Sequence, residues 1–312
     1  MALTLKKIEE AEWQAAFKNQ YHSIFFDPDY LNLVKSAFNY NLHYYVCRKA
    51  DNLQFAAALF SHKGKIVVPY AFTYNSIYFD KSIGDIIYVQ IIEDFIKLLK
   101  YQFNNFFLRL PPSFTDLRPF IWAEFQISNR YTYYRESSKQ LTNKLLKGIK
   151  KVENHLTFKV NNANQEDISL NLDICFRYGL PKKLYANYKY LFDELSEKGY
   201  LKSFCVYYQN ELVCTQIAII DIKSRSLSTI SINDLNNRMY VSYLNYEIYK
   251  WCDQNGIDYI DMVGANEKGI ANFKYSFNAN LVPYFLVSYN RNTYFKHFAK
   301  KVKKVIKRLI RR

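Results

Sequence analysis

The chain has little glycine or proline, and its cysteines and histidines do not cluster. Of its 312 residues, Gly contributes 8 and Pro 7, while 49% are apolar, which excludes a disordered or low-complexity protein. The five cysteines include no CxxC pair, so we expect reduced, buried thiols rather than a disulfide framework. The five histidines show no metal-ligand spacing, so no metal site is expected. No GxSxG elbow of a serine hydrolase is present.

Long apolar runs and a secretory leader are also missing. The longest apolar runs, such as 55–60, fall short of the roughly 20 residues that a membrane-spanning helix needs. The first ten residues turn polar and acidic, unlike a signal peptide. We therefore expect a cytoplasmic protein, with peripheral attachment to the inner membrane face as an option.

Acidic residues are fewer than basic ones, 28 against 43, which gives a net charge of +15. The excess is concentrated in residues 294–312, which hold nine Lys or Arg and no acid, so that residues 1–293 carry +6. Apolar residues recur in this tail at three- and four-residue steps, which predicts a basic amphipathic helix. Such a helix could lie on an anionic bilayer, dock on its own domain or contact tRNA, and these alternatives stay open.

Two halves of the chain share one order of predicted elements: a β-meander, an amphipathic helix and a short strand. The predicted meanders cover 43–79 and 201–234, the helices 86–101 and 240–255, and the strands 106–110 and 259–263. The two meanders match with an offset of about 160 residues, which indicates a tandem duplication.

The segment between the halves predicts a domain boundary. Residues 137–155 read as a helix with Ser137 or Ser138 near its N-cap and a solvated basic side. Two further helices, at 166–176 and 184–198, are expected to open the second half.

The stretch 236–280 points to a functional site. A helix leads through Gly256 into a short strand, which ends in a polar loop punctuated by glycine. A second short helix then carries Phe273, Lys274 and Phe277. Because open α/β sheets bind ligands outside the carboxyl ends of their strands, a lysine just past such an end predicts a functional group.

These residues, in this order, resemble the G-x-x-x-x-D-x-x-G and F-K-x-x-F patterns of the GNAT acyltransferase superfamily, and more narrowly its Fem/BioF2-like branch. The motif residues are Gly256, Asp261, Gly264, Gly269, Phe273, Lys274 and Phe277. Segments 25–34 and 145–155 also lie where that branch has similar sequences.

The resemblance implies an α/β (α+β) fold of two tandem GNAT-like domains. Each domain would be a mixed, mostly antiparallel sheet flanked by helices, followed by the C-terminal basic amphipathic helix. We expect an N-terminal GNAT-like domain at 1–140, a C-terminal acyltransferase domain at 141–293 and the helical tail at 294–312.

The resemblance also implies N-acyl transfer, from acyl-CoA as co-substrate, to an amine on a cell-envelope or polysaccharide precursor that could be lipid-linked. One alternative is an aminoacyl-tRNA-dependent Fem-type transferase that acts on a peptidoglycan precursor. A third possibility, from another class, is a membrane-associated binding protein with a degenerate GNAT fold. One departure bears on the donor: the helix start at 233–243, where CoA-dependent members have a glycine-rich pyrophosphate loop, contains no glycine.

The resemblance assigns roles to twelve residues. Lys274 would stabilise developing negative charge, and Asp261 would act as a base, orient the amine, or instead cap the loop after its strand. Arg238 could replace part of the phosphate loop. The expected donor-binding residues are Asn233, Arg238, Met239, Tyr240 and Val241. The expected acceptor-binding residues are Tyr70, Tyr74, Asn75, Asn266 and Phe273.

Overall fold

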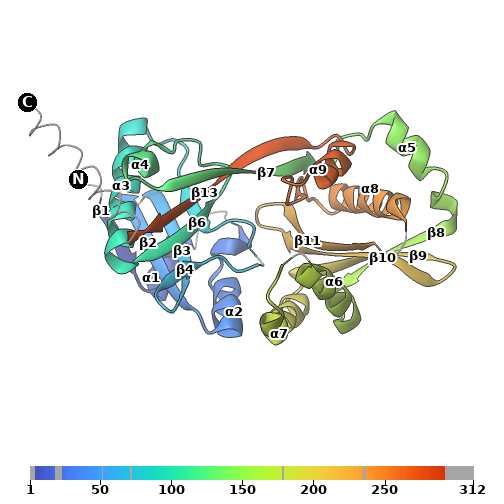
Figure 1. The fold of residues 1–312 in the computed structure, drawn as a ribbon, viewed down its shortest axis with the longest axis horizontal. Coiled ribbons are helices and arrows are strands. Elements are labelled where there is room, and N and C mark those ends of the chain that lie inside the picture. Colours follow the sequence, from blue (N-terminus) through green and yellow to red (C-terminus); the bar gives the residue numbers. More distant parts are fainter. Residues whose placement is uncertain are drawn as a thin grey trace, which may run out of the picture. The chain divides into compact units, whose positions relative to one another are not determined.

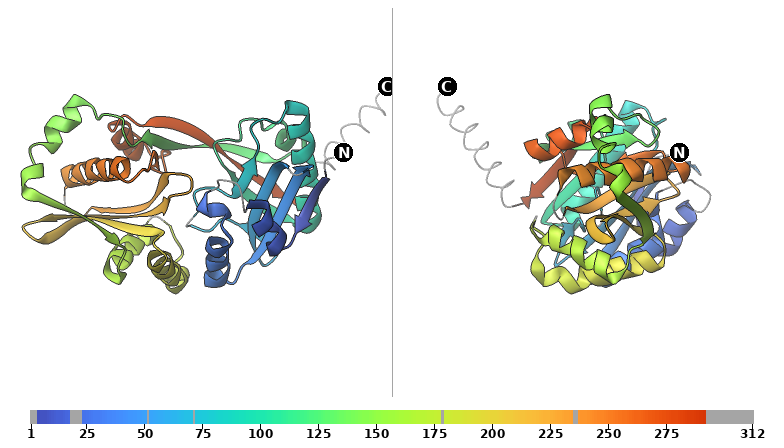
Figure 2. Two further views of the ribbon diagram at one scale, coloured as in Figure 1. Left: turned by 180° about the vertical axis from the view of Figure 1, so that it is seen from behind. Right: turned by 90° about the vertical axis from the view of Figure 1, so that its right-hand side faces the viewer.

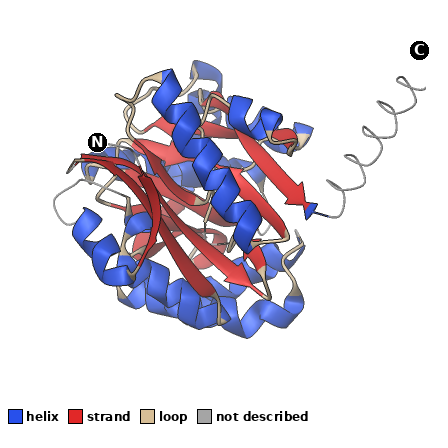
Figure 3. Cartoon of the chain, turned by 90° about the vertical axis from the view of Figure 1, so that its left-hand side faces the viewer, coloured by secondary structure: helices blue, strands red, loops and turns tan. Residues whose placement is uncertain are grey.

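The computed structural model describes residues 4–17, 23–50, 52–70, 72–177, 179–234 and 237–291. The chain forms two compact units, each assembled from separate parts of the sequence (Figure 1). The first unit comprises Met1–Ala16, Tyr40–Asn129 and Tyr284–Arg312, and the second Phe17–Asn39 and Arg130–Pro283. Helices lie outside the strands, as Figure 3 shows. The expected tail helix at 294–312 lies outside the described residues.

The first unit is built on a mixed sheet with the strand order β1-β2-β3-β4-β6-β13, and β5 pairs with β3. Its elements are β1 (Thr4–Ile8), α1 (Glu10–Phe17), β2 (Asn41–Lys49), β3 (Asn52–His62), β4 (Lys65–Val67), β5 (Ser76–Phe79), α3 (Asp85–Gln102), β6 (Asn105–Leu110), α4 (Arg118–Trp122) and the end of β13 (Asn280–Asn290). Neighbouring residues of β2 point to opposite faces. Tyr44 packs against Trp13 of α1, and Tyr45 against Phe95 of α3, so helices cover both faces.

The second unit repeats this plan with the strand order β7-β12-β11-β10-β9-β8. Its strands are β7 (Gln126–Glu136), β8 (Leu156–Asn162), β9 (Leu201–Tyr208), β10 (Glu211–Asp221), β11 (Ser226–Asp234) and β12 (Tyr259–Asp261). Its helices are η1 (Ile24–Phe26), α2 (Pro28–Phe38), α5 (Asn143–Ile149), η2 (Glu153–His155), α6 (Gln165–Arg177), η3 (Lys182–Leu184), α7 (Tyr185–Glu197), α8 (Arg238–Gln254) and α9 (Lys268–Tyr275). Helices α6 and α8 lie on opposite faces of the strands (Figure 2).

The duplicated order predicted from the sequence is confirmed element by element. In each unit, a parallel pair follows the meander: β4 with β6 in the first unit and β11 with β12 in the second. A long helix lies in the connection between the two strands of each pair: α3, preceded by β5, in the first unit and α8 in the second. Nine strand pairs are antiparallel: β1–β2, β2–β3, β3–β4, β3–β5, β6–β13, β7–β12, β8–β9, β9–β10 and β10–β11. The expected mixed, mostly antiparallel sheets are therefore present.

The final strand of each sheet comes from an unexpected part of the chain. β13 pairs with β6 and completes the first unit, although it lies near the C-terminal end of the chain. β7 pairs with β12 and completes the second unit, although it directly follows the first. In addition, α2 packs with α7 of the second unit, where Phe38 meets Tyr188 edge to face at 4.6 Å. The compact units therefore do not coincide with the contiguous domains that the sequence led us to expect at 1–140 and 141–293.

The helix expected at 137–155 is wrong as a single element. β7 extends to Glu136, and the amide of Ser137 donates to the carbonyl of Asp258, which keeps the chain in the sheet. Helix α5 begins only at Asn143, where Thr142 Oγ1 accepts from the amide of Leu145 as the N-cap. The pairing of β7 extends the sheet through Ser137, so the first residues of the expected helix are not helical.

Within the described residues, no helix combines the length and the apolar character that crossing a membrane requires. All five cysteines are free and buried, as expected.

Candidate functional site

The second unit has an opening between two parallel strands. β11 and β12 pair only from Ser226 opposite Tyr259 to Ser228 opposite Asp261. Beyond that point, the chain after β12 stays with β7, since the amide of Met262 donates to Tyr133 and that of Ala265 to Tyr131. β11 continues to Asp234, paired with β10. The two strands therefore separate at their carboxyl ends.

Helix α8 begins at this opening because it follows β11 directly. Its N-cap is Asn237, whose Oδ1 accepts from the amide of Met239 at 2.9 Å. The carbonyl of Asn237 accepts from the amide of Tyr240 at 2.9 Å. The exposed guanidinium of Arg238 lies over the ring of Phe273, 5.3 Å from its centroid. The structure thus brings together one predicted donor-binding and one predicted acceptor-binding residue.

Lys274 is buried, and its ammonium points back to the loop after β12. It donates to the carbonyls of Met262 at 2.6 Å and Gly264 at 2.7 Å, and also to that of Val263. An ammonium has three donors, so these carbonyls use all of them. Burial lowers the pKa of Lys274 to about 8, against the opposing effect of the Asp261 carboxylate. This geometry gives Lys274 a positioning role, and direct contact with substrate stays a prediction.

The loop that Lys274 holds has an unusual backbone. Val263 has a φ of 50° and Gly264 a φ of 53°, both in the left-handed region. A β-branched residue rarely adopts that conformation, and it persists only where the surroundings fix it. The Lys274 contacts supply one restraint, and the Asp261 carboxylate, which accepts from the amide of Val263 at 2.9 Å, supplies the other.

Asp261 therefore takes the loop-capping alternative that the sequence left open. Its side chain is buried, and Oδ1 also accepts from the hydroxyl of Thr132 at 2.5 Å. Asn266 makes a similar structural contact, accepting from the amide of Tyr131 at 3.0 Å. Asp261 is buried, whereas Asn266 is exposed, and the acceptor-binding role of Asn266 stays a prediction.

The other predicted donor-binding residues pack inside the second unit. Asn233 is buried and donates to the carbonyl of Leu170 in α6, on the face of the sheet opposite α8. The Met239 side chain lies against Gly148 of α5. Tyr240 stacks on Tyr208, with ring centroids 6.3 Å apart. Val241 belongs to the core. Of this group, Arg238 alone is exposed at the opening.

The three predicted acceptor-binding residues of the first unit lie in the loop before β5. Asn75 is buried and pairs with Arg109 of β6, donating through its amide at 2.8 Å and accepting through Oδ1 at 2.7 Å. Tyr74 packs edge to face on Tyr284 at 5.3 Å. Tyr70 is the most exposed of the three, at 38%. Arg109 further holds the loop by donating to the carbonyls of Phe72 and Thr73.

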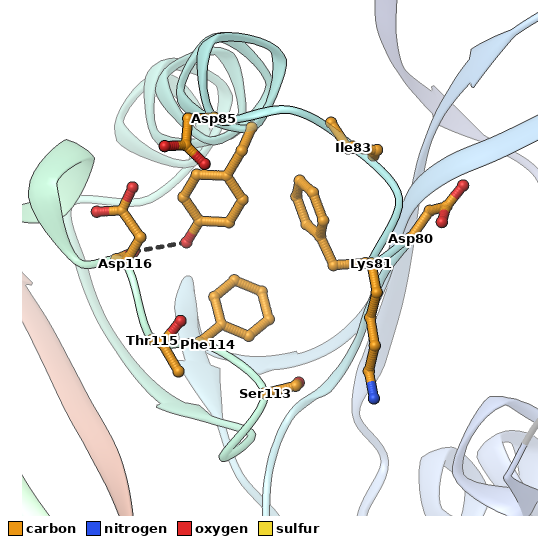
Figure 4. Close-up of a pocket in the computed structure, with 10 residues that line it drawn as sticks. Asp80, Lys81, Ile83, Asp85, Ser113, Phe114, Thr115 and Asp116 are labelled. Atoms are coloured by element: carbon orange, nitrogen blue, oxygen red, sulfur yellow. Dashed lines mark hydrogen bonds between the residues drawn. The ribbon is translucent and has the colours of Figure 1, made fainter.

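A cavity of about 220 Å³ opens in the first unit at the start of α3 (Figure 4). Its lining combines aromatic and polar side chains: Phe79, Asp80, Lys81, Ile83, Asp85, Tyr88, Ser113, Phe114, Thr115 and Asp116. The hydroxyl of Tyr88 donates to the carbonyl of Asp116 at 2.6 Å, which ties α3 to the loop after β6. In the duplicated plan, this place corresponds to the start of α8 and the loop after β12. None of the predicted site residues lines it.

Solved structures share this arrangement over most of the chain. The crystal structure of FemX gives a TM-score of 0.60 at 10% identity and covers 90% of this chain and 96% of that one. A tandem GNAT protein from the clavulanic acid biosynthesis pathway gives 0.58 at 8%, covering 93% and 99%. The C-terminal domain of a putative lysylphosphatidylglycerol synthetase from Agrobacterium fabrum gives 0.55 at 9%, covering 90% and 93%. The fold is GNAT-like.

The tandem GNAT-like fold with Fem-like structural relatives confirms what the sequence motifs implied. At identities of 8–10%, the likeness shows the fold alone. No protein-family model and no curated protein sequence matches the chain. Within the described part of this GNAT-like fold, no group of three or more His, Cys, Asp and Glu side chains is placed to hold a metal ion.

The sequence motifs missed two residues that organise the GNAT-like site. Asn is a common N-cap residue, but asparagines also occupy 233 and 236, so the sequence does not show which of them caps α8. Arg135 is 1% exposed and donates to the carbonyls of Phe277 at 3.0 Å and Ser137 at 3.3 Å, and also to those of Glu136 and Lys139. It stacks on Tyr249 at 4.2 Å. No local pattern identifies Arg135, because two of its partners, Phe277 and Tyr249, lie more than a hundred residues away in the sequence.

Proposed function

We propose that this chain is an N-acyltransferase that moves an acyl or aminoacyl group onto an amine of a cell-envelope precursor. The observation that carries the proposal is the opening where β11 and β12 separate, with the start of α8 beside it. Ligands of open α/β sheets bind at such strand ends. The GNAT and Fem-like structural relatives support the class of reaction.

The reaction requires no covalent enzyme intermediate. A neutral amine attacks the carbonyl carbon of a thioester or an aminoacyl ester, and a tetrahedral oxyanion forms. Its collapse breaks the bond to the thiol or to the tRNA hydroxyl, which leaves with a proton derived from the amine. The protein contributes proximity and a fixed electrostatic environment.

Two side chains receive roles in this scheme. We assign Arg238 to a phosphate of the donor, because its guanidinium is exposed at the start of α8 and positioned by the ring of Phe273. Lys274 holds the loop 262–264 at the end of β12, so that the loop's backbone stays fixed during the reaction. We place Lys274 behind this loop, as a positioning residue.

The helix start favours aminoacyl-tRNA over acyl-CoA as the donor. A pyrophosphate held in the usual GNAT manner needs free amides at a helix N-terminus. Here the amide of Met239 already donates to the side chain of Asn237. In addition, residues 233–243 contain no glycine, whose missing side chain would let a phosphate approach the backbone closely. The sequence resemblance placed acyl-CoA first, and this cap shifts our proposal to the Fem-type donor.

Incubation with labelled aminoacyl-tRNA and, separately, with labelled acetyl-CoA tests the donor. We expect label transfer to an envelope precursor from aminoacyl-tRNA and thermal stabilisation of the protein by it. Transfer from acetyl-CoA alone would refute the tRNA version while leaving acyl transfer intact. If neither donor transfers label or stabilises the fold, the chain is instead a binding protein with a degenerate GNAT fold.

For the acceptor, we propose that the cavity at the start of α3 holds part of the precursor. It combines the rings of Phe79, Tyr88 and Phe114 with the hydroxyls of Ser113 and Thr115, a mixture suited to a sugar or peptide group. Thr115→Trp should fill it and raise the acceptor KM with little change in kcat. Lys65→Trp is the matched control, because Lys65 is an exposed residue of the same unit that does not line the cavity, so the acceptor KM should stay unchanged. An unchanged KM in Thr115→Trp would exclude the cavity as the acceptor site.

A further inference from the structure

The first unit exposes large apolar side chains along one edge. Ile121 is 59% exposed and Trp122 57%, and the two form the end of α4. Tyr101, in the last turn of α3, is 87% exposed. We call Tyr101, Ile121 and Trp122 the apolar edge. Exposing three such side chains in water is unfavourable, and grouped exposed apolar residues are a mark of interaction surfaces.

Contacts within the first unit place the apolar edge close to the point where the chain runs into its basic tail. Helices α3 and α4 lie side by side in Figure 1, and Lys100 Nζ donates to the carbonyl of Ala123 at 2.8 Å. Lys100 also lies over the ring of Tyr289 in β13, 4.8 Å from its centroid. Arg291, which directly follows β13, donates through its amide to the carbonyl of Asn104 and through its guanidinium to Asn104 Oδ1, at 2.9 Å each. Arg291, the last described residue, therefore lies beside the end of α3.

The fixed charges near the apolar edge largely cancel. Lys97 pairs with Asp94 at 2.9 Å, and Arg118 pairs with Asp116 at 2.7 Å. The attraction for an anionic partner comes from the tail, whose residues 294–312 carry nine Lys or Arg and no acid. An anionic lipid surface attracts such a segment, and each Lys or Arg near the surface adds to the attraction.

We propose that the apolar edge is a membrane-docking surface, which inserts into the headgroup region of an anionic bilayer next to the site bound by the basic tail. The partner fits because tryptophan and tyrosine favour the boundary between headgroups and acyl chains. Stable attachment generally takes two signals, and the apolar edge supplies the second one beside the electrostatic attraction of the tail. The proposal does not depend on which group the protein transfers.

Trp122 makes the proposal directly measurable. The chain contains three tryptophans. Trp13 is fully buried and Trp251 is half-buried, so Trp122 is the one exposed to solvent. With the full chain and vesicles of phosphatidylglycerol, we expect its emission to shift to shorter wavelength and to be quenched by brominated acyl chains. Trp122→Phe should remove both signals.

A matched pair of variants tests the contribution of the apolar edge to binding. Ile121→Ser should weaken binding to these vesicles about tenfold, because the isoleucine side chain would leave water when it inserts into the bilayer and the serine side chain gains little from doing so. Ile222→Ser is the control, because Ile222 is 75% exposed but belongs to the second unit. Equal binding by the two variants would contradict the proposal.

Two further outcomes would also overturn it. If the chain binds anionic vesicles but bromolipids do not quench Trp122, the tail alone makes the contact. If the emission shift appears without vesicles and grows with protein concentration, the apolar edge binds a second copy of the chain. Light scattering distinguishes that case, because it reports the mass of the assembly.

Discussion

Lys274 and Arg135 are buried cations that donate hydrogen bonds to main-chain carbonyls. Lys274 binds three carbonyls of one loop, and Arg135 binds four, which come from β7, the segment after β7 and the segment after α9. A buried charge is costly unless it is fully hydrogen-bonded, so both side chains fix the backbone around them. The sequence motif singled out Lys274, but it could not show that the ammonium faces inward.

Replacing Lys274 should affect stability as well as activity. Lys274→Met leaves three carbonyls without their donor, so we expect a loss of about 2 kcal/mol at pH 7. Because the loop 262–264 then relaxes, kcat should fall. Chemical denaturation and steady-state kinetics measure the two effects. A variant that loses activity with unchanged stability would instead indicate direct contact with the substrate.

The pH dependence of stability provides a second test of Lys274. Its pKa is lowered to about 8 in the folded protein, against 10.5 in the unfolded chain. Between these values, the unfolded chain binds more protons, so the free energy of unfolding rises with pH. Relative to Lys274→Met, the wild type should gain about 1 kcal/mol from pH 8 to pH 9. Identical pH profiles of the two proteins would show that the ammonium is not buried.

Arg135 should be the most sensitive residue in the second unit. Arg135→Lys keeps the charge but replaces a five-donor fork with a three-donor ammonium, and it loses the stacking on Tyr249. We expect destabilisation of about 3 kcal/mol, measured by urea unfolding. Arg130→Lys is the control, since Arg130 is exposed on the same strand. Similar stability of the two variants would contradict this account.

At the scale of elements, the sequence predicts what local periodicity determines. The helices at 86–101, 166–176, 184–198 and 240–255 all appear within two residues of their expected bounds. β7 is different, because it pairs with β12 more than a hundred residues away and its residues lack a clean alternation. The same limit applies to the site. The loop after β12 could be located from the sequence, whereas the contacts of Asp261 with Thr132 and of Asn266 with Tyr131 depend on β7.

The cap of α8 tests the choice of donor. Asn237→Ala removes the acceptor for the amide of Met239, so the protein should lose about 1 kcal/mol of stability. The freed amide should also strengthen binding of pyrophosphate compounds such as CoA, measured by calorimetry. Thr142→Ala removes the N-cap of α5 and serves as the control, because it should lower stability without changing CoA binding. Unchanged CoA binding by Asn237→Ala would mean that the cap does not exclude the pyrophosphate.

At the scale of the whole molecule, the two units exchange their last strands. A simple tandem duplication would leave β7 with the first unit and β13 with the second, and the boundary expected at 140 follows from that assumption. Periodicity identifies each strand but not its partner, since antiparallel neighbours can be any distance apart in the chain. The fold class was therefore predictable from the motifs, and the composition of the units was not.

This exchange predicts how fragments of the protein behave. The fragment 1–140 lacks β13, which pairs with β6, and the fragment 141–293 lacks β7 together with Arg135, on which the site of the second unit depends. Each fragment alone exposes a sheet edge and part of a core, so neither should unfold cooperatively on heating. Co-expressed, they should copurify and recover one cooperative transition, because each supplies the strand that the other lacks. Calorimetry and size-exclusion chromatography measure both results. Independent cooperative folding of 141–293 would show that the second unit does not need β7. The contact of β7 with Asp261, which restrains the loop after β12, would then be dispensable as well.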